Sequence, residues 1–338
     1  MGTQALIPTI DVSALFAADP RARAATDAAI MDAAVGTGFM LIHAVPEVVP
    51  TGKRVRAELL RLFELPAGSL QPLWRQKFAP AHPNVYRGWF VLQQGFPTAK
   101  EGIDMGADVA YGPGVVVASD PLREATPLPP EELLPGWRGA VAAYYRGMEL
   151  LANALMRSMA RSLGLPEQFF DSAFERGLST LRLIRYPVRE DLDPADAQLW
   201  VSHQGERRSL IGIPHVDSGF LTVLAQDDVA GLQARHSSGA WVDVPPREGT
   251  LAVNFGKVLE RWSGGRIKAT EHRVLGGGRE RYSIPFFYEA RAEAEIAPLP
   301  IADAAQFAPF LYGDYLWATT TQFVEFAGLG QLRKPLRG

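Results

Sequence analysis

Hydrophobic residues recur in the first half of the chain at the spacing of α-helices. Three stretches show this pattern and predict helices: residues 22–36, 47–65 and 138–163. The longest is closed by Gly164 and Pro166, residues that end helices. Residues 38–43 are continuously apolar and predict a buried strand, whereas residues 80–118, rich in Pro, Gly and aromatics, predict loops with short extended pieces. The first half is therefore predicted to be mainly helical.

After Ser179 the pattern changes to short β-rich runs separated by turn residues. The predicted strands are 180–186, 219–226, 232–235, 241–244, 250–254, 272–274 and 282–288. This spacing favours a sandwich or jelly roll over a parallel α/β sheet. Residues 305–326 predict a helix again, and the polar residues 189–209, which include a predicted surface His203, fit either a mobile lid or a plain surface loop.

The chain shows no repeat, linker or low-complexity tract that would divide it. We predict a single domain over residues 1–338. Residues 1–178 form a mainly helical N-terminal layer with early strands, 179–290 a β core carrying the chemistry, and 291–338 a C-terminal helix and tail. The predicted fold class is mainly β with flanking helices.

Composition narrows the range of partners. Lys and Arg number 34 against 37 Asp and Glu, a net charge of −3, which offers no broad basic face for nucleic acid or membrane lipid. The absence of cysteine excludes disulfides, thiolate metal sites and a thiol nucleophile. No basic, apolar leader is visible, and no apolar run approaches the roughly 20 residues that span a bilayer. We expect a cytoplasmic protein, monomeric or weakly homo-oligomeric, that acts on a small molecule.

The segment around His215 and Asp217 carries the strongest chemical signal. Residues two apart on a strand point to the same face, so this imidazole and this carboxylate can lie side by side. Such a pair forms two-thirds of a facial triad for iron(II), and His272, at the start of a later β-like run, is the candidate third ligand. Zinc can use the same ligands, and an isolated His-x-Asp triplet also occurs on ordinary surface strands.

A second pair follows nine positions after His272. Arg281 and Ser283 share one face of a predicted strand, where a guanidinium group donates two parallel hydrogen bonds to a carboxylate and a hydroxyl adds a third donor. Alone, this pair more often marks a solvated strand face. Its position after the candidate ligands makes it a candidate carboxylate-binding site.

In this order and spacing the chain resembles the iron(II)- and 2-oxoglutarate-dependent dioxygenases of the isopenicillin N synthase-like family. The resemblance extends from about residue 7 to about residue 326. Its segments are Ile7 to Asp11, Gly38 to His43, Phe63 to Pro66, Leu183 to Pro187, His215 to Gln233, Asn254 to Gly256, Trp262 to Gly265, His272 to Val274 and Arg281 to Phe287.

The resemblance implies a double-stranded β-helix, a cupin-like jelly roll with iron near its mouth. It places His215, Asp217 and His272 on the catalytic metal ligands, and Arg281 and Ser283 on the residues that bind the far carboxylate of 2-oxoglutarate. Tyr186 occupies a position that reaches this carboxylate in several members, although a half-buried strand tyrosine beside proline is an equally good interpretation. The implied reaction uses Fe(II), 2-oxoglutarate and O₂, and hydroxylates a metabolite with formation of succinate and CO₂.

Three departures keep alternatives open. Lys257 stands where many members carry Asp, Ser218 where an aromatic is usual, and Ile184 where plant members use a polar residue toward the co-substrate. The segments at 183–187 and 281–287 look closer to isopenicillin N synthase itself, which uses no 2-oxo acid. An iron oxidase without 2-oxoglutarate, or a desaturating, ring-forming or ethylene-forming outcome, therefore remains an alternative.

Substrate contacts are expected from loops rather than from the strands. The candidates are Arg87, Trp89 and Phe90 in the loops at 82–106, together with Phe287 on a core strand. Arg87 suits a polar or anionic group and Trp89 a flat or apolar one. The competing interpretation is that both pack the helical layer. We expect the pocket between the mouth of the jelly roll and the loops at 82–106 and 189–209.

Overall fold

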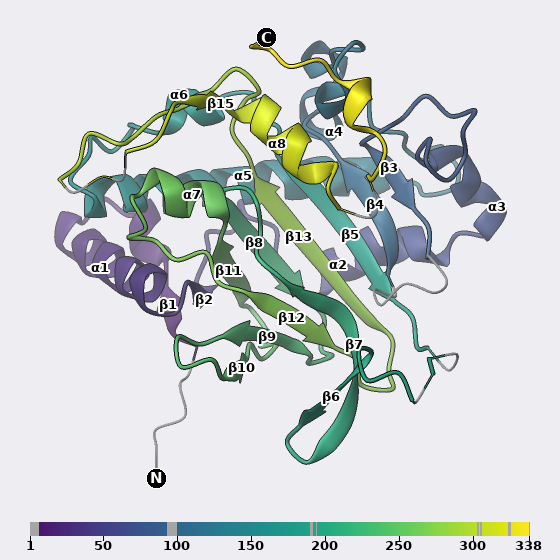
Figure 1. Ribbon diagram of the computed structural model, residues 1–338, viewed down its shortest axis with the longest axis horizontal. Helices are drawn as coiled ribbons and strands as arrows, with labels where there is room; N and C mark the ends of the chain where they lie inside the picture. The colour runs from purple at the N-terminus through teal and green to yellow at the C-terminus, as the bar shows by residue number, and fades with distance from the viewer. Residues whose placement is uncertain are drawn as a thin grey trace.

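The computed structural model describes residues 7–92, 100–189, 192–193, 195–302, 304, 306–323 and 326–337 (Figure 1). Its main sheet has eight strands in the order β1 (Thr9–Asp11), β2 (Phe39–His43), β11 (Leu251–Phe255), β8 (Leu221–Gln226), β13 (Arg281–Tyr288), β5 (Thr180–Tyr186), β4 (Glu101–Met105) and β3 (Gly88–Phe90). Only the edge pair β1 and β2 is parallel in this sheet as described.

A second sheet is antiparallel throughout its described pairs. Its order is β10 (Trp241–Asp243), β9 (Leu232–Arg235), β12 (His272–Leu275), β7 (Glu206–His215) and β6 (Trp200–His203), and a small pair, β14 (Glu295–Ile296) with β15 (Phe310–Leu311), lies apart. Apolar side chains of both sheets form one buried cluster, with Leu41 and Ala252 from the main sheet and Leu232 and Val274 from the second. The predicted jelly-roll core is confirmed.

Helices cover the outer face of the main sheet and its ends. They are α1 (Pro20–Gly36), α2 (Lys53–Leu60), α3 (Ala67–Leu70), α4 (Asp108–Tyr111), α5 (Trp137–Ser162), α6 (Asp171–Phe174), α7 (Lys257–Trp262) and α8 (Tyr312–Thr320). Short 3₁₀ helices span Ser13–Phe16, Arg61–Glu64, Gln71–Leu73, Pro113–Val115, Pro121–Arg123 and Gly330–Leu332. Among the helices described, none combines the length and the apolar character that crossing a bilayer requires.

Local sequence explains where the two main helices lie. α1 begins because the Asp19 carboxylate accepts a hydrogen bond from the backbone N–H of Arg21 at 2.9 Å and Pro20 suits the first helical position. α5 packs behind β8 and β13, as Figure 1 shows, because one of its faces is apolar. From this face the Tyr145 ring contacts Phe286 at 5.0 Å, and its hydroxyl donates to the carbonyl of Ser179 at 2.9 Å.

Three predicted segments differ from the structure. Residues 200–209 of the predicted 189–209 loop lie in the β6–β7 hairpin, and its tight turn places Gln204 and Gly205 at positive φ. The polar sequence concealed this hairpin because much of it is exposed to solvent. His203 is not a free surface side chain, since its ring lies 3.2 Å from the Asp243 carboxylate and only 19% of the side chain is exposed. The C-terminal helix is confined to α8; residues 305, 324 and 325 of the predicted helix lie outside the described residues.

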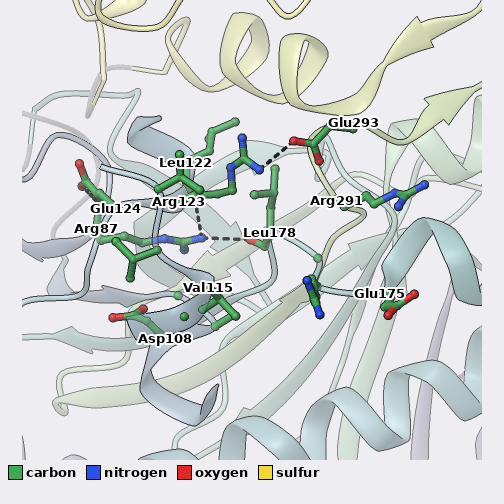
Figure 2. Close-up of a pocket in the computed structure, with 17 residues that line it drawn as sticks. Arg87, Asp108, Val115, Leu122, Arg123, Glu124, Glu175, Leu178, Arg291 and Glu293 are labelled. Carbon is green, nitrogen blue, oxygen red and sulfur yellow. Dashed lines mark hydrogen bonds and ion pairs between the residues drawn. The ribbon is translucent and has the colours of Figure 1, made fainter. Parts of the chain in front are cut away.

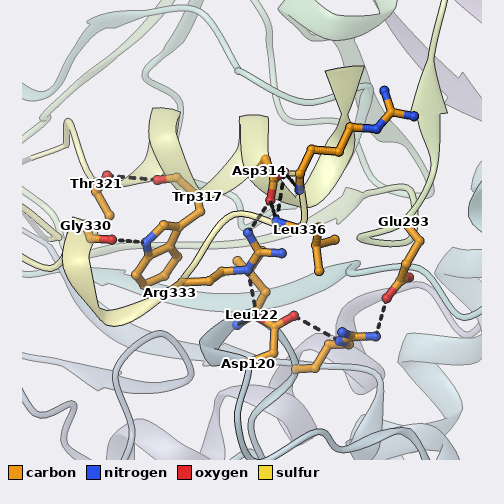
Figure 3. Close-up of polar contacts among 11 residues, drawn as sticks. Asp120, Leu122, Glu293, Asp314, Trp317, Thr321, Gly330, Arg333 and Leu336 are labelled. Carbon is orange, nitrogen blue, oxygen red and sulfur yellow. Dashed lines mark hydrogen bonds and ion pairs between the residues drawn. The ribbon is translucent and has the colours of Figure 1, made fainter. Parts of the chain in front are cut away.

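Polar contacts fasten the end of the chain to α8 (Figure 3). The Arg333 guanidinium donates to the carboxylates of Asp120 at 2.9 Å and Asp314 at 2.8 Å. The indole N–H of Trp317 in α8 donates to the carbonyl of Gly330 at 2.8 Å. These contacts fix α8 to the segments around Gly330 and Arg333, and through Arg333 to Asp120.

A buried ion cluster connects β4 and β5. Asp104 accepts hydrogen bonds from Arg182 at 2.5 and 2.9 Å and from Arg75. Burial by itself raises the pKa of Asp104, but the guanidinium groups of Arg182 and Arg75 outweigh burial and lower the pKa to about 2. The negative charge of Asp104 is therefore coupled to folding.

We expect this cluster to make the protein sensitive to acid. Because the pKa of Asp104 is lower in the folded chain than its ordinary 3.8, its stabilisation is complete above about pH 5 and is lost as the pH falls through 4 and past 2. The loss amounts to roughly 2 kcal/mol. At pH 7, Asp104→Asn leaves Arg75 without its partner and lowers the free energy of unfolding by roughly 3–5 kcal/mol.

Urea denaturation at several pH values measures both effects. Asp228→Asn is the matched control, because Asp228 is exposed and its pair with Arg279 is worth at most about 1 kcal/mol. If Asp104→Asn lost as much stability as the wild type between pH 4 and 2, the pKa of Asp104 would not be responsible.

Candidate metal and co-substrate site

Two paired strands bring the candidate ligands together. In the antiparallel register of β12 with β7, His272 lies opposite His215, and Asp217 follows two residues after the end of β7. The Nε2 atoms of His215 and His272 lie 3.9 and 3.7 Å from Oδ1 of Asp217. Ligand atoms of the three side chains all lie within 4.8 Å of one another, close enough to hold one metal ion.

Hydrogen bonds orient each of these donors. Nδ1 of His215 lies 2.8 Å from the carbonyl of Ile213, and Nδ1 of His272 lies 3.2 Å from the carbonyl of Thr270. Each Nδ1–H therefore donates to the backbone and leaves the Nε2 lone pair toward the shared centre. Asp217 uses its other oxygen, Oδ2, which accepts from the Thr222 hydroxyl at 2.6 Å and the Asn254 amide at 2.7 Å.

The electrostatics favour the protonation states that a metal requires. Burial and the neighbouring His272 together lower the pKa of His215 to about 4, although Asp217 opposes the shift and 40% of the side chain is exposed. Burial raises the pKa of Asp217, but the two histidines and the hydrogen bonds from Thr222 and Asn254 produce a net lowering. At neutral pH the His215 imidazole is neutral and the carboxylate ionised. Two nitrogens and one oxygen on one side of a centre, with other positions open, fit iron(II).

Arg281 lies in the cavity that contains these ligands. The cavity has a volume of about 500 Å³, and Tyr186 and Ser283 also line it. Gln226 accepts a hydrogen bond from Arg281. Arg281 is only 1% exposed, and one amino group donates to Gln226 at 3.2 Å. Its Nε and its other amino group have no partner among the described residues. A buried guanidinium with unused donors fits a carboxylate ligand.

The strand register places the other predicted co-substrate residues beside Arg281. Tyr186 pairs with Arg281 across β5 and β13, and its ring centre lies 5.3 Å from the guanidinium carbon. Ser283 follows on the same face of β13, and both residues line the cavity. The structure thus brings together all six predicted metal and co-substrate residues.

The predicted substrate contacts are only partly in this cavity. Phe287 lines it, but Trp89 and Phe90 do not. Trp89 packs against Phe63 with ring centres 5.4 Å apart, and the Phe90 ring lies under the guanidinium of Arg182 at 5.4 Å. Trp89 therefore packs against the helical layer through Phe63, as the competing interpretation held, and Phe90 packs in the core.

Arg87 lies at a different cavity of about 440 Å³ (Figure 2). Its guanidinium donates to the Thr180 hydroxyl at 2.5 Å and to the carbonyls of Leu178 at 3.1 Å and Leu122 at 3.3 Å. These bonds join three segments behind the metal cavity. The expectation that Arg87 lines the metal pocket is therefore wrong in this structure.

The loops predicted to form the pocket contribute unequally. Tyr86 and Lys100 line the metal cavity, while residues 93–99 lie outside the described part of the chain. None of the lining residues comes from the described part of 189–209, in which residues 190, 191 and 194 are not described. The structure thus gives no support for a lid there.

Sequence reasoning missed much of the cavity wall. The missed lining residues include Thr180, Arg182, Glu289, Leu316, Thr320, Gln322, Phe323 and Phe326. Thr180 and Arg182 share the strand face of Tyr186 by their even spacing, so alternation along β5 contained the signal. The five residues from Leu316 to Phe326 lie in or after α8, and their local sequence does not indicate which strand they face.

Comparisons with known proteins agree with this geometry. Residues 182–290 match the 2OG-Fe(II) oxygenase superfamily. Isopenicillin N synthase of Streptomyces clavuligerus is 31% identical over 318 residues, covering 92% of this chain and 93% of that protein. The 2-oxoglutarate-Fe(II) type oxidoreductase hxnY of Emericella nidulans is 30% identical over 308 residues, covering 87% and 82%.

A solved structure extends the comparison to the whole fold. It is a full-length Neurospora crassa protein in complex with alpha-KG and 5-formyluracil, and it superposes with a TM-score of 0.78 at 25% identity, covering 96% of this chain and 98% of that one. The chain belongs to the 2OG-Fe(II) oxygenase superfamily. It is an oxidoreductase whose cofactors are Fe(II) and 2-oxoglutarate, as the sequence predicted.

The hydrogen bonds to Asp217 lead to a prediction about metal affinity. Thr222→Val keeps the side-chain volume but removes the hydroxyl that fixes Oδ2, so the carboxylate can rotate away from the two imidazoles. We expect affinity for Fe(II) to fall roughly 10- to 100-fold. Anaerobic calorimetric titration measures it, with Thr250→Val as control because that hydroxyl donates only to the turn carbonyl of Arg247. Unchanged affinity in Thr222→Val would show that Asp217 needs no such support.

Proposed function

We propose that this enzyme hydroxylates a small organic metabolite at iron(II) held by His215, Asp217 and His272. In this proposal Arg281 anchors the far carboxylate of 2-oxoglutarate, whose oxidation yields succinate and CO₂. The observation that carries the proposal is the buried, incompletely bonded guanidinium of Arg281 in the cavity of the three candidate ligands. A carboxylate would satisfy the unused donors of this group.

The residues of the chain have distinct roles in this mechanism. Iron(II) with bound 2-oxoglutarate supplies the electrons that activate O₂. His215, Asp217 and His272 would hold the iron, and a set of three protein ligands would leave it able to bind the co-substrate and O₂. Ser283 is placed to add a hydroxyl donor beside Arg281, while the Tyr186 ring supports the guanidinium from one side.

Apolar side chains shape the rest of the cavity. Phe287, Leu316, Phe323 and Phe326 line its walls and favour an organic substrate while excluding water from the reacting atoms. A cavity of about 500 Å³ suits a small metabolite. The Neurospora crassa complexes, which contain 5-formyluracil or thymine beside alpha-KG, support this size class. Cytoplasmic location and a monomeric or weakly oligomeric state remain part of the proposal.

The direct test is consumption of 2-oxoglutarate. Protein purified without oxygen, loaded with Fe(II) and exposed to air is expected to form one succinate for each 2-oxoglutarate consumed, faster when a substrate is present. His272→Ala is expected to lose at least about 10-fold in iron affinity and most succinate formation. Isopenicillin N synthase is among the relatives, so full substrate oxidation without any 2-oxo acid would favour an oxidase instead.

Arg281→Lys tests the anchor separately from the metal. An ammonium group cannot reproduce the two parallel hydrogen bonds of a guanidinium, so we expect a loss of about 2 kcal/mol or more in 2-oxoglutarate binding. This corresponds to a rise in KM of at least about 30-fold. Affinity for Fe(II) should stay within about twofold of the wild type, since Arg281 is not a ligand.

Arg279→Lys is the matched control, because Arg279 is an exposed arginine two residues away that pairs with Asp228. Its KM for 2-oxoglutarate is expected to equal that of the wild type. Normal use of 2-oxoglutarate by Arg281→Lys would place the anchor elsewhere.

A further inference from the structure

Glu289 is a buried carboxyl group in the wall of the metal cavity. It directly follows β13 and is 7% exposed. Two acidic residues line this cavity among the described residues, Asp217 and Glu289. Asp217 is a candidate metal ligand. Glu289 is the other acidic group, and the proposed mechanism gives it no role.

The fold holds this carboxyl group in place. The Tyr312 hydroxyl in α8 donates to Oε2 of Glu289, and the backbone N–H of Glu289 donates to the Ser179 hydroxyl at 3.1 Å. A Cβ atom on Gly219 would lie 2.3 Å from Oε1 of Glu289, and one on Gly177 would lie 2.1 Å from the Glu289 carbonyl oxygen. Any side chain at either glycine would displace the group, so its position depends on both.

In the described part of the chain, no salt bridge joins Glu289 to a positively charged side chain. Among the described residues, no nitrogen of Lys, Arg or His lies within 4.0 Å of its carboxylate. Arg182 lines the same cavity but its guanidinium bonds Asp104 at 2.5 Å, and Arg281 is the proposed anchor of 2-oxoglutarate.

The absence of a described positively charged partner affects the pKa of Glu289. Burial, with a smaller contribution from the negative charge of Asp217, raises the pKa of Glu289 to about 8, although hydrogen bonds from Tyr312 and from the backbone of Phe220 and the charge of Arg87 oppose the rise. Ionising a buried acid without a partner costs free energy. A cation that entered the cavity and contacted the carboxylate would offset part of that cost.

We propose that Glu289 binds a positively charged nitrogen of the substrate, and that the enzyme therefore acts on a small amine. The apolar part of such an amine would contact Phe287, Leu316 and Phe323, which line the same cavity. This inference rests on the proposed function, because it assigns the substrate class of that site.

A purely structural role is the competing explanation. Glu289 would then only support Tyr312 and the turn at Gly219. Glu289→Gln separates the two explanations, because an amide oxygen still accepts from the Tyr312 hydroxyl but carries no charge. The fold is kept and the ion pair is lost.

The experiment compares amines with alcohols of the same shape. The Fe(II) and 2-oxoglutarate complex, kept without oxygen, is titrated by calorimetry with benzylamine and benzyl alcohol, and with the straight-chain pair butylamine and butanol. We expect at least one amine to bind at least about 10-fold more tightly than its alcohol in the wild type. In Glu289→Gln this ratio is expected to fall to about 1, with the affinity for the alcohol unchanged. Glu293→Gln is the matched control, because Glu293 pairs with Arg123 and does not line this cavity.

Three results would overturn the proposal. The first is that the wild type shows no preference for an amine over its alcohol. The second is that the preference persists in Glu289→Gln, as it would if the amine bound the metal directly. The third is that the preference is also lost in Glu293→Gln. Succinate formation from 2-oxoglutarate by the same preparations is measured in parallel. If it is normal while the amine preference is absent, only the assignment of Glu289 fails; if it is absent in the wild type, the proposed function fails first.

Discussion

The pairing of β12 with β7 is the constraint on which the rest of the site depends. Side chains alternate between the two faces of a strand, so a shift of one residue in this pairing would turn His272 away from His215. Val274, which follows two residues later on the same strand, would leave the cluster between the sheets. The β12–β7 ladder is irregular between His272 and Val274, but β12 pairs regularly with β9, where His272 lies opposite Ala234 and Val274 opposite Leu232. Burial of Val274 and the orientation of His272 therefore depend on the register of β12 in this sheet.

Buried charge is distributed unevenly around the cavity. Asp104 is bonded by two guanidinium groups, and Asp217 by a hydroxyl and an amide, so these anions are stabilised by the protein itself. Arg281 keeps donors without a partner among the described residues, and the Glu289 carboxyl accepts a hydrogen bond from Tyr312 but has no described cation paired with it. Since buried polar groups in folded proteins are generally satisfied, such groups at a cavity are best understood as positions that ligands complete.

The candidate metal and co-substrate residues on the strands could be predicted from sequence, whereas most residues that line the rest of the cavity could not. His215, Asp217, Arg281 and Ser283 lie on strands or at their ends, where a two-residue spacing fixes the shared face. Arg87 was misassigned because its partners, Leu122, Leu178 and Thr180, come from distant segments. The prediction of a single domain remains a proposal, supported by one hydrophobic cluster that runs from Ile10 to Phe326.

The attachment of α8 has a consequence for how such enzymes can diverge. The donor set is complete by β13, whereas Leu316 and Thr320 reach the cavity from a helix fastened separately through Asp314 and Arg333. Replacing side chains along that helix alters which molecules fit without disturbing the strands that carry the oxidative chemistry. Gene variants confined to this late segment therefore offer a short evolutionary route to new substrates, with the reactive centre inherited intact.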